Sequence, residues 1–154
     1  MNRNILLAGL IVGAVLLVGC APSVVVENKT GFAVRVVVHS AGRSEVVSPS
    51  PGESSVAEVE EGPYLATAIP DADWIEWAKL TRKVLNDQLT NSDQLTGPQL
   101  LEVVRRLKDI AARMQQYESA GIGASCSGAV SSDGGDGKVV ISTAANGALV
   151  ATCR

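Results

Sequence analysis

The sequence predicts an α+β protein in which an antiparallel β-sheet or a small β-sandwich carries an inserted antiparallel hairpin of two helices. Three observations point to this class. Residues 24–69 and residues 122–153 contain short runs of β-branched residues between turn residues, which is typical of strands. Residues 72–119 instead repeat their apolar residues every three or four positions, as amphipathic helices do. We therefore expect β-structure at both ends of the chain and two helices between them.

The first β-region is expected to form two hairpins. One joins the runs 24–27 and 32–39, and the other joins the runs 54–59 and 64–69, each across a four-residue connection that contains glycine. In the second run, Val34, Val36 and Val38 fall on one face of the strand, so this face should point into the core. Turns are expected at residues 41–43 and at Pro51-Gly52.

Two helices are expected, at about residues 72–90 and 98–119. Asp73 followed by Glu76, and Thr96 followed by Gln99, have the spacing of capping boxes at the helix starts. The apolar stripe of the first helix should be buried, and its members are Trp74, Trp77, Ala78, Thr81, Val84, Leu85 and Leu89. Ile75 and Leu80 fall outside this stripe. They contact the β-layer or form an exposed contact for a partner, and the sequence leaves both alternatives open.

The C-terminal region predicts strands near residues 124–130, 138–143 and 148–152, with Asn146-Gly147 as the turn of a hairpin. Few large apolar residues lie in this region, so its strands could hardly bury a core of their own. We expect them to complete the N-terminal β-structure.

Cys126 and Cys153 form one pair in addition to Cys20. In an exported protein such a pair predicts a disulfide, which would contribute about 3.5 kcal/mol in the chain-entropy description. The alternatives are a metal pair or a redox pair. Both are disfavoured because the cysteines lie far apart, without a CxxC spacing or a nearby histidine.

The N-terminus has the layout of an export signal. Arg3 lies in a short positive segment, and residues 5–18 contain no charged side chain. This apolar run is shorter than the roughly 20 residues that a membrane-spanning helix needs. Leu17, Val18, Gly19 and Cys20 then resemble the lipobox of bacterial lipoproteins. The alternative is an ordinary signal peptide with a chance cysteine.

The resemblance implies that residues 1–19 are removed and that Cys20 carries a diacylglyceryl thioether, with a further acyl chain such as palmitate on its new amine. Two or more acyl chains hold a domain stably on a membrane. Residue 21 is alanine and not aspartate, so the inner-membrane retention signal of Gram-negative lipoproteins is absent. The expected location is therefore the outer membrane if the organism has one, and the cell membrane otherwise. Residues 20–23 then comprise the lipidated cysteine and a short tether, and residues 24–154 form a single α+β domain.

Charge restricts the partners of the mature chain. Without Arg3 it holds 12 basic and 16 acidic residues, so its net charge is −4. A mildly acidic surface disfavours nucleic acid as a partner. The expected partners are the membrane, through lipid on Cys20, and an envelope protein, through the helical hairpin.

Three candidate sites have simpler interpretations. His39, the only histidine, is expected to be a surface or half-buried strand residue, because no catalytic or zinc motif surrounds it. The Asp133–Gly137 segment has oxygen ligands for calcium but lacks the EF-hand spacing, which favours a solvated loop. Trp74, Trp77 and Tyr64 would suit a sugar-binding platform, yet core packing is favoured. No cofactor or metal is expected.

These expectations favour a non-enzymatic, membrane-anchored binding or structural module of the bacterial cell envelope. One alternative is a carbohydrate-binding lipoprotein, which requires Trp74 or Trp77 to be exposed beside polar side chains. The other is a small envelope hydrolase that uses a serine or the acids near residues 58–61, which requires a polar cleft joining them to His39.

Overall fold

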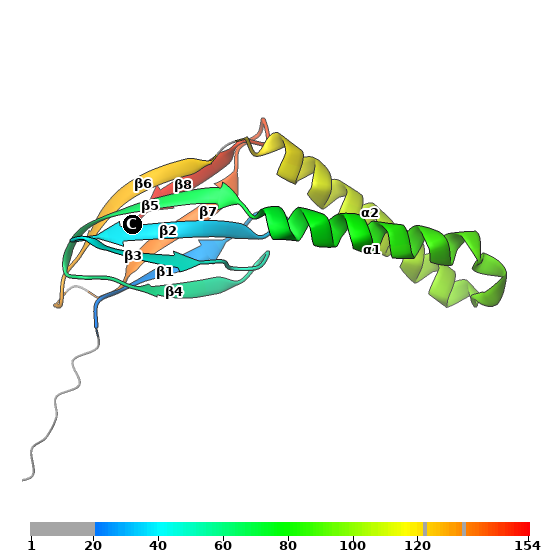
Figure 1. Cartoon of the computed structure of the whole chain (residues 1–154), viewed down its shortest axis with the longest axis horizontal. Coiled ribbons are helices and arrows are strands. Elements are labelled where there is room, and N and C mark those ends of the chain that lie inside the picture. Colours follow the sequence, from blue (N-terminus) through cyan, green and yellow to red (C-terminus); the bar gives the residue numbers. More distant parts are fainter. Residues whose placement is uncertain (1–20, 122, 134) are drawn as a thin grey trace, which may run out of the picture.

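The computed structural model describes residues 21–154, apart from residues 122 and 134, and consists of two four-stranded β-sheets and a helical hairpin (Figure 1). The predicted α+β class with an inserted helical hairpin is confirmed. The strands are β1 (Ser23–Asn28), β2 (Val34–Ser40), β3 (Arg43–Val47), β4 (Ser54–Glu58), β5 (Gly62–Pro70), β6 (Ala124–Val130), β7 (Gly137–Thr143) and β8 (Leu149–Cys153). The helices are α1 (Ala72–Thr90), the short 3-10 helix η1 (Ser92–Gln94) and α2 (Gly97–Ser119).

The two sheets pack face to face as a β-sandwich. One has the strand order β4-β1-β7-β8, and the other has the order β3-β2-β5-β6. Neighbouring strands are antiparallel, except that β1 and β7 run parallel, with Val26 opposite Val139. The C-terminal strands thus join both sheets, and the expectation that they complete the N-terminal β-structure is confirmed.

The prediction of two β-hairpins in the first β-region is wrong. β1 pairs with β4 and β7, whereas β2 lies in the other sheet and pairs with β3 and β5. The connection after β1 is held by buried Asn28, whose Nδ2 donates to the carbonyls of Phe32 (2.8 Å) and Pro49 (3.0 Å). Its Oδ1 accepts from the N–H (2.9 Å) and the hydroxyl (2.7 Å) of Thr30. This network turns the chain across the sandwich instead of back along the same sheet.

The core fills the space between the sheets. Val34, Val36 and Val38 of β2 point into it as predicted, and they pack with residues of the opposite sheet such as Val26 and Ile141. Five residues lie at the boundary between the sandwich and the hairpin and belong to the same cluster: Phe32, Trp74, Ala78, Ile110 and Met114. The sandwich and the base of the hairpin therefore share one continuous apolar core.

The helices begin and end close to the predicted residues. The capping box of α2 is confirmed, because the Thr96 N–H donates to Gln99 Oε1 at 2.9 Å. The predicted capping box of α1 is wrong: its N-cap is Asp71, whose Oδ1 accepts from the Asp73 N–H at 3.1 Å. Beyond their base, the two helices extend past the end of the sandwich (Figure 1). Within residues 21–154, no described helix is long and apolar enough to cross a membrane.

Candidate functional site

The predicted lipidation site, residues 17–20, lies outside the described residues. The chain is described from Ala21, and β1 already begins at Ser23. The preceding Pro22 is also tied to the sandwich, because its carbonyl accepts from the Val59 N–H at 3.0 Å. Any group attached at Cys20 is therefore separated from the folded body by only about two residues, or roughly 7 Å of extended chain.

The N-terminal end of β1 and the helical hairpin lie at opposite ends of the sandwich (Figure 1). At one end, the Ser23 hydroxyl donates to Asp136 Oδ1 in the loop between β6 and β7 (2.6 Å). At the other end, the Gly31 N–H just beyond β1 donates to Gln116 Oε1 of α2 (3.1 Å). The hairpin consequently points away from the position at which an N-terminal anchor would hold the chain.

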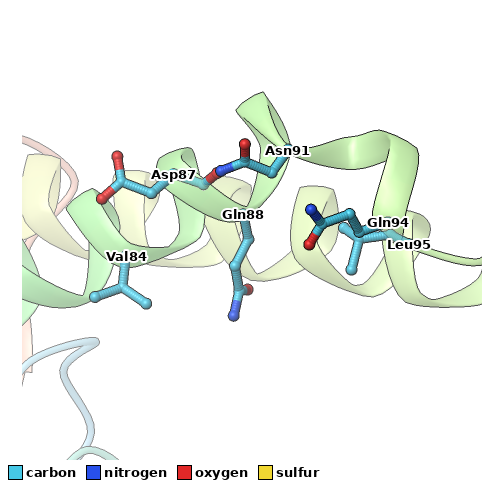
Figure 2. Close-up of a pocket in the computed structure, with 6 residues that line it drawn as sticks. All are labelled: Val84, Asp87, Gln88, Asn91, Gln94 and Leu95. Atoms are coloured by element: carbon cyan, nitrogen blue, oxygen red, sulfur yellow. The ribbon is translucent and has the colours of Figure 1, made fainter.

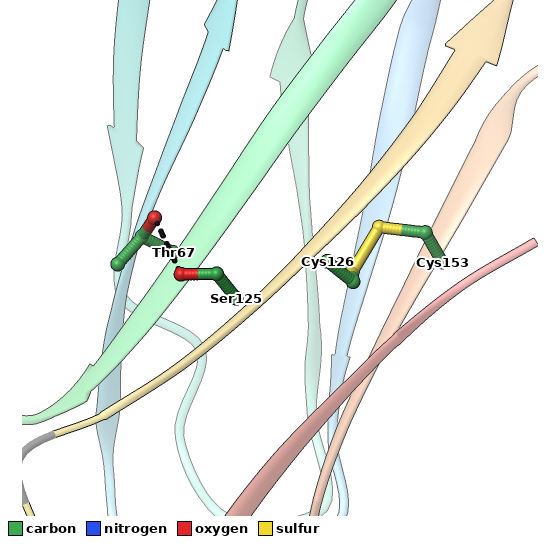
Figure 3. The surroundings of a disulfide bond; sticks show 4 residues. All are labelled: Thr67, Ser125, Cys126 and Cys153. Carbon is green, nitrogen blue, oxygen red and sulfur yellow. Dashed lines mark hydrogen bonds between the residues drawn. A yellow bond between two sulfur atoms is a disulfide. The ribbon is translucent and has the colours of Figure 1, made fainter.

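The disulfide between Cys126 and Cys153 is confirmed, and it links the edges of the two sheets (Figure 3). Cys126 lies on β6 and Cys153 on β8, with their Cα atoms 5.6 Å apart. Beside it, the hydroxyls of Thr67 and Ser125 lie 3.0 Å apart and join β5 to β6. The disulfide thus links the two sheets covalently along one side of the sandwich.

His39 is exposed on β2, and its Nδ1 lies 2.6 Å from the Ser44 hydroxyl on the neighbouring strand β3. Glu58, one of the acids considered in the hydrolase hypothesis, pairs with Arg43 (3.2 Å). The described contacts of His39 and of this acid therefore involve different partners. Ser44 is a neighbour of His39 that the sequence pattern had not indicated, since it depends on the β2–β3 register.

The described part of the segment considered for calcium, residues 133 and 135–137, lies between β6 and the first residue of β7. Its Asp136 carboxylate is engaged by the Ser23 hydroxyl. Among the residues that the structure describes, which exclude Gly134, no group of three or more His, Cys, Asp or Glu side chains is placed to hold a metal ion.

The aromatic residues divide into a buried group and one exposed tryptophan. Phe32, Trp74 and Tyr117 pack together where the hairpin meets the sandwich, with ring centroids 5.3 to 6.0 Å apart. Tyr64 is buried between the sheets, as predicted. The burial predicted for Trp77 is wrong, since 54% of this residue is exposed. Because α1 extends beyond the sandwich, only the side of the helix that faces α2 is covered there.

Ion pairs also hold the base of the hairpin to the sheet. The Arg35 guanidinium of β2 lies 3.3 Å from the buried carboxylate of Asp71 and 3.3 Å from the exposed carboxylate of Asp73. Asp71 thus caps α1 and at the same time binds the sheet. Burial raises the pKa of the nearby Tyr117 hydroxyl, and the negative charge of Asp71 raises it further.

The outer part of the hairpin exposes an apolar stripe on α1. Trp77, Leu80 and Val84 are 54%, 64% and 49% exposed, and their spacing places them on one side of the helix. The burial predicted for Val84 and Leu89 is therefore wrong as well. Of the two residues left open by the sequence, Ile75 packs against the core and Leu80 is exposed.

Three shallow clefts follow this stripe along one face of the hairpin, and we call them together the hairpin groove. The cleft nearest the base lies between Trp77 and Thr81 of α1 and Arg106 and Arg113 of α2, with Ile110 among the residues that line it. The two clefts near the tip share Gln88 and Leu95. Figure 2 shows Val84 and Gln88 pointing to the same side of α1 in one of them. The groove is therefore open and elongated, unlike an enclosed pocket.

The α2 side of the groove carries paired charges. Arg105 donates two hydrogen bonds to Glu102 (2.7 and 2.9 Å), and Arg113 pairs with Asp109 (3.2 Å). The hydrogen bond from Arg105 lowers the pKa of Glu102, with a further contribution from the charge of Arg106. Arg106 itself forms no ion pair with the residues that the structure describes.

Comparison of the chain with protein-family models, with curated proteins and with solved structures finds no match. A functional assignment consequently depends on the residues and geometry of this chain.

Proposed function

We propose that the protein is a lipid-anchored, extracytoplasmic module of the bacterial cell envelope that binds a partner through its helical hairpin and catalyses no reaction. The observation that carries this proposal is the placement of the N-terminal residues and the hairpin at opposite ends of the molecule. The residues next to Cys20 lie at one end of the sandwich, and the hairpin extends from the other (Figure 1). Such a chain would hold its hairpin away from the membrane.

The exposed residues of the hairpin support a binding role. A soluble surface tolerates isolated apolar side chains, whereas contiguous ones mark contact sites. Trp77, Leu80 and Val84 are adjacent on α1 and all face solvent. Tryptophan and arginine, both of which border the groove, are enriched among residues that dominate binding energy.

The anchor is tested with Cys20→Ser in the full chain. The unaltered chain should incorporate a fatty-acid analogue and sediment with membranes, because the thioether requires the cysteine sulfur. The variant should lose the label and appear in the soluble fraction. Labelling that persists in the variant would refute lipidation at this residue.

The binding surface is tested separately with Leu80→Glu and Val84→Glu in the anchored chain. Partner recovery after crosslinking in native membranes should be lost, since a charge would be placed in the apolar stripe. Val56→Glu is the matched control, because Val56 is similarly exposed but lies on β4 of the sandwich. Equal recovery with the hairpin variants and the control would place the contact elsewhere.

Carbohydrate binding is a second candidate, because Trp77 is exposed beside Arg106, Asp109 and Arg113. An exposed indole next to polar groups suits stacking against a sugar ring. The cleft at this position measures about 70 Å³, well below the roughly 300 to 1,000 Å³ of typical ligand pockets. Any sugar would therefore lie on the surface. Titration calorimetry with peptidoglycan and lipopolysaccharide fragments should show binding that Trp77→Ala abolishes.

A further inference from the structure

The two sides of the hairpin groove differ in charge. The solvent side of α1 next to Trp77, Leu80 and Val84 carries three acids, Asp73, Glu76 and Asp87, with Lys83 as the one basic residue among them. Because Asp73 pairs with Arg35, the acids available to a partner are Glu76 and Asp87. The matching side of α2 carries Arg105, Arg106 and Arg113 together with Glu102 and Asp109. Since each of these two acids already binds an arginine of α2, the positive charge available to a partner is that of Arg106. The α1 side is thus weakly acidic, and the α2 side is weakly basic.

A surface with opposite charges on its two halves is complementary to a copy of itself turned by a two-fold axis. We propose that the hairpin groove binds the hairpin groove of a second copy of this chain, so that the two hairpins form a four-helix bundle. The two-fold axis runs parallel to the hairpins, which places α1 of each copy against α2 of the other. The acidic side of one copy then faces the basic side of its partner, and the apolar stripe of each is covered.

Positions along the helices agree with this arrangement. Val84 lies 12 residues from the start of α1, and Arg106 lies 13 residues from the end of α2. At 1.5 Å per residue, both are about 18 to 20 Å from the base of the hairpin. In the bundle, Val84 of one copy therefore lies level with Arg106 of the other, and the aliphatic part of the arginine can pack on the valine.

The direction of the hairpins also agrees with the anchor, and in this respect the inference depends on the proposed function. With the axis parallel to the hairpins, both hairpins point the same way, and the N-terminal ends of both β1 strands lie on the same side. Two copies held by Cys20 in one membrane can therefore associate without bending the tether of either chain.

The size of the surface predicts a weak, reversible dimer. α1 has 19 residues and is about 28 Å long, and two adjacent helices are about 20 Å wide. Two such faces bury about 1,100 Å² in total, just below the roughly 1,200 to 2,000 Å² of stable specific interfaces and in the range of transient ones. Anchoring in one membrane would raise the effective concentration of the copies and favour association.

The test uses cysteine pairs in the full chain. Two differently tagged copies, one with Val84→Cys and one with Arg106→Cys, are produced together, and the membrane and soluble fractions are each treated with a short bismaleimide. We expect a covalent dimer carrying both tags. The matched control combines Arg82→Cys with Lys108→Cys, which are exposed, lie at the same level and fall on the opposite face of the hairpin. The control should give no dimer, and Leu80→Glu should abolish the dimer in the first pair.

Every other outcome overturns the dimer, its interface or the proposed anchor. Failure of the first pair to crosslink while both copies remain in the membrane fraction refutes the dimer but leaves the anchor intact. Equal crosslinking of both pairs refutes the hairpin groove as the dimer interface. An adduct between Val84→Cys and a protein of different sequence shows that another protein occupies the groove. Crosslinking of copies that are found only in the soluble fraction would support the dimer and refute the proposed anchor, so the two proposals fail separately.

Discussion

The β-sandwich and the helical hairpin differ in how completely they bury their apolar side chains. In the sandwich, the inward-facing residues of both sheets are almost inaccessible, as Val36 and Ile141 are. In the outer hairpin, each helix buries only the side that faces the other, and Trp77, Leu80 and Val84 remain open to solvent. The sandwich therefore accounts for stability, whereas the hairpin has apolar surface available for binding. The following variants test this difference.

The largest expected difference is between Ile141→Ala and Leu80→Ala. Ile141 is fully buried, so its truncation leaves a cavity and should lower the free energy of unfolding by about 2 to 5 kcal/mol. Leu80 is 64% exposed, and its truncation should change that free energy by less than about 0.5 kcal/mol. Urea unfolding of the purified chains measures both. Similar losses in the two variants would contradict the division between sandwich and hairpin.

Loss of the disulfide should destabilise the sandwich by about 3.5 kcal/mol, reduced by any strain in the native bond, because the unfolded chain gains freedom in a long loop. The double variant Cys126→Ala, Cys153→Ala removes the link between β6 and β8. Thermal unfolding followed by circular dichroism measures the loss, and the unaltered chain under reducing conditions provides a second comparison. An unchanged melting temperature in both would show that the disulfide does not constrain the unfolded chain.

The junction of the two regions depends on Asp71, which caps α1 and contacts Arg35. Asp71→Ala should lower the free energy of unfolding by about 1 kcal/mol. Asp73→Ala is the control, because that side chain also lies near Arg35 but is largely exposed and does not cap the helix. Chemical unfolding of both variants should show the larger loss for Asp71→Ala, and the reverse order would contradict the assignment of the cap.

The smallest expected effect concerns Tyr64, whose buried hydroxyl has no hydrogen-bond partner among the described residues. Burial raises its pKa above the usual 10.0, so the folded chain favours the neutral phenol. The contribution of the neutral Tyr64 phenol to the free energy of unfolding is complete below about pH 10. It is lost as the pH rises towards the pKa that Tyr64 has in the folded chain, because the tyrosine ionises first in the unfolded chain. Tyr64→Phe should raise the free energy of unfolding by up to about 1 kcal/mol.

The same variant should also reduce the loss of stability between about pH 9 and pH 11. Unfolding measured across this range, with Tyr117→Phe for comparison, separates the contributions of the two tyrosines whose pKa is raised. A lower stability of Tyr64→Phe at pH 7 would indicate that the hydroxyl has a partner after all.

The helices could be predicted from the sequence more fully than the pairing of the strands. Helix ends are determined by nearby residues, such as Thr96 with Gln99, which bond as expected. Strand pairing instead depends on whether a turn keeps the chain in one sheet or carries it across the sandwich. The bonds of Asn28 to Phe32 and Pro49 decide this for β1, and the bond to Pro49 joins residues that no local pattern connects. The parallel pairing of β1 with β7 was missed for the same reason.

The candidate site was predictable only in part. The resemblance of residues 17–20 to a lipobox is local and was visible in the sequence. The exposure of Trp77 was not, because helical periodicity shows which residues share a side of α1 but not how far the sandwich extends beneath that side. The hairpin groove requires both helices, since Thr81 and Arg106 are brought together only when α1 and α2 pack.

The most direct test of the hairpin as the binding surface is photocrosslinking in native membranes. A photoreactive amino acid replaces either Leu80 of α1 or Val56 of β4, which are 64% and 57% exposed. We predict a discrete adduct from position 80 and none from position 56, with the position 80 adduct reduced when Cys20→Ser releases the chain from the membrane. An adduct from position 56 alone, or none from position 80, would contradict this prediction.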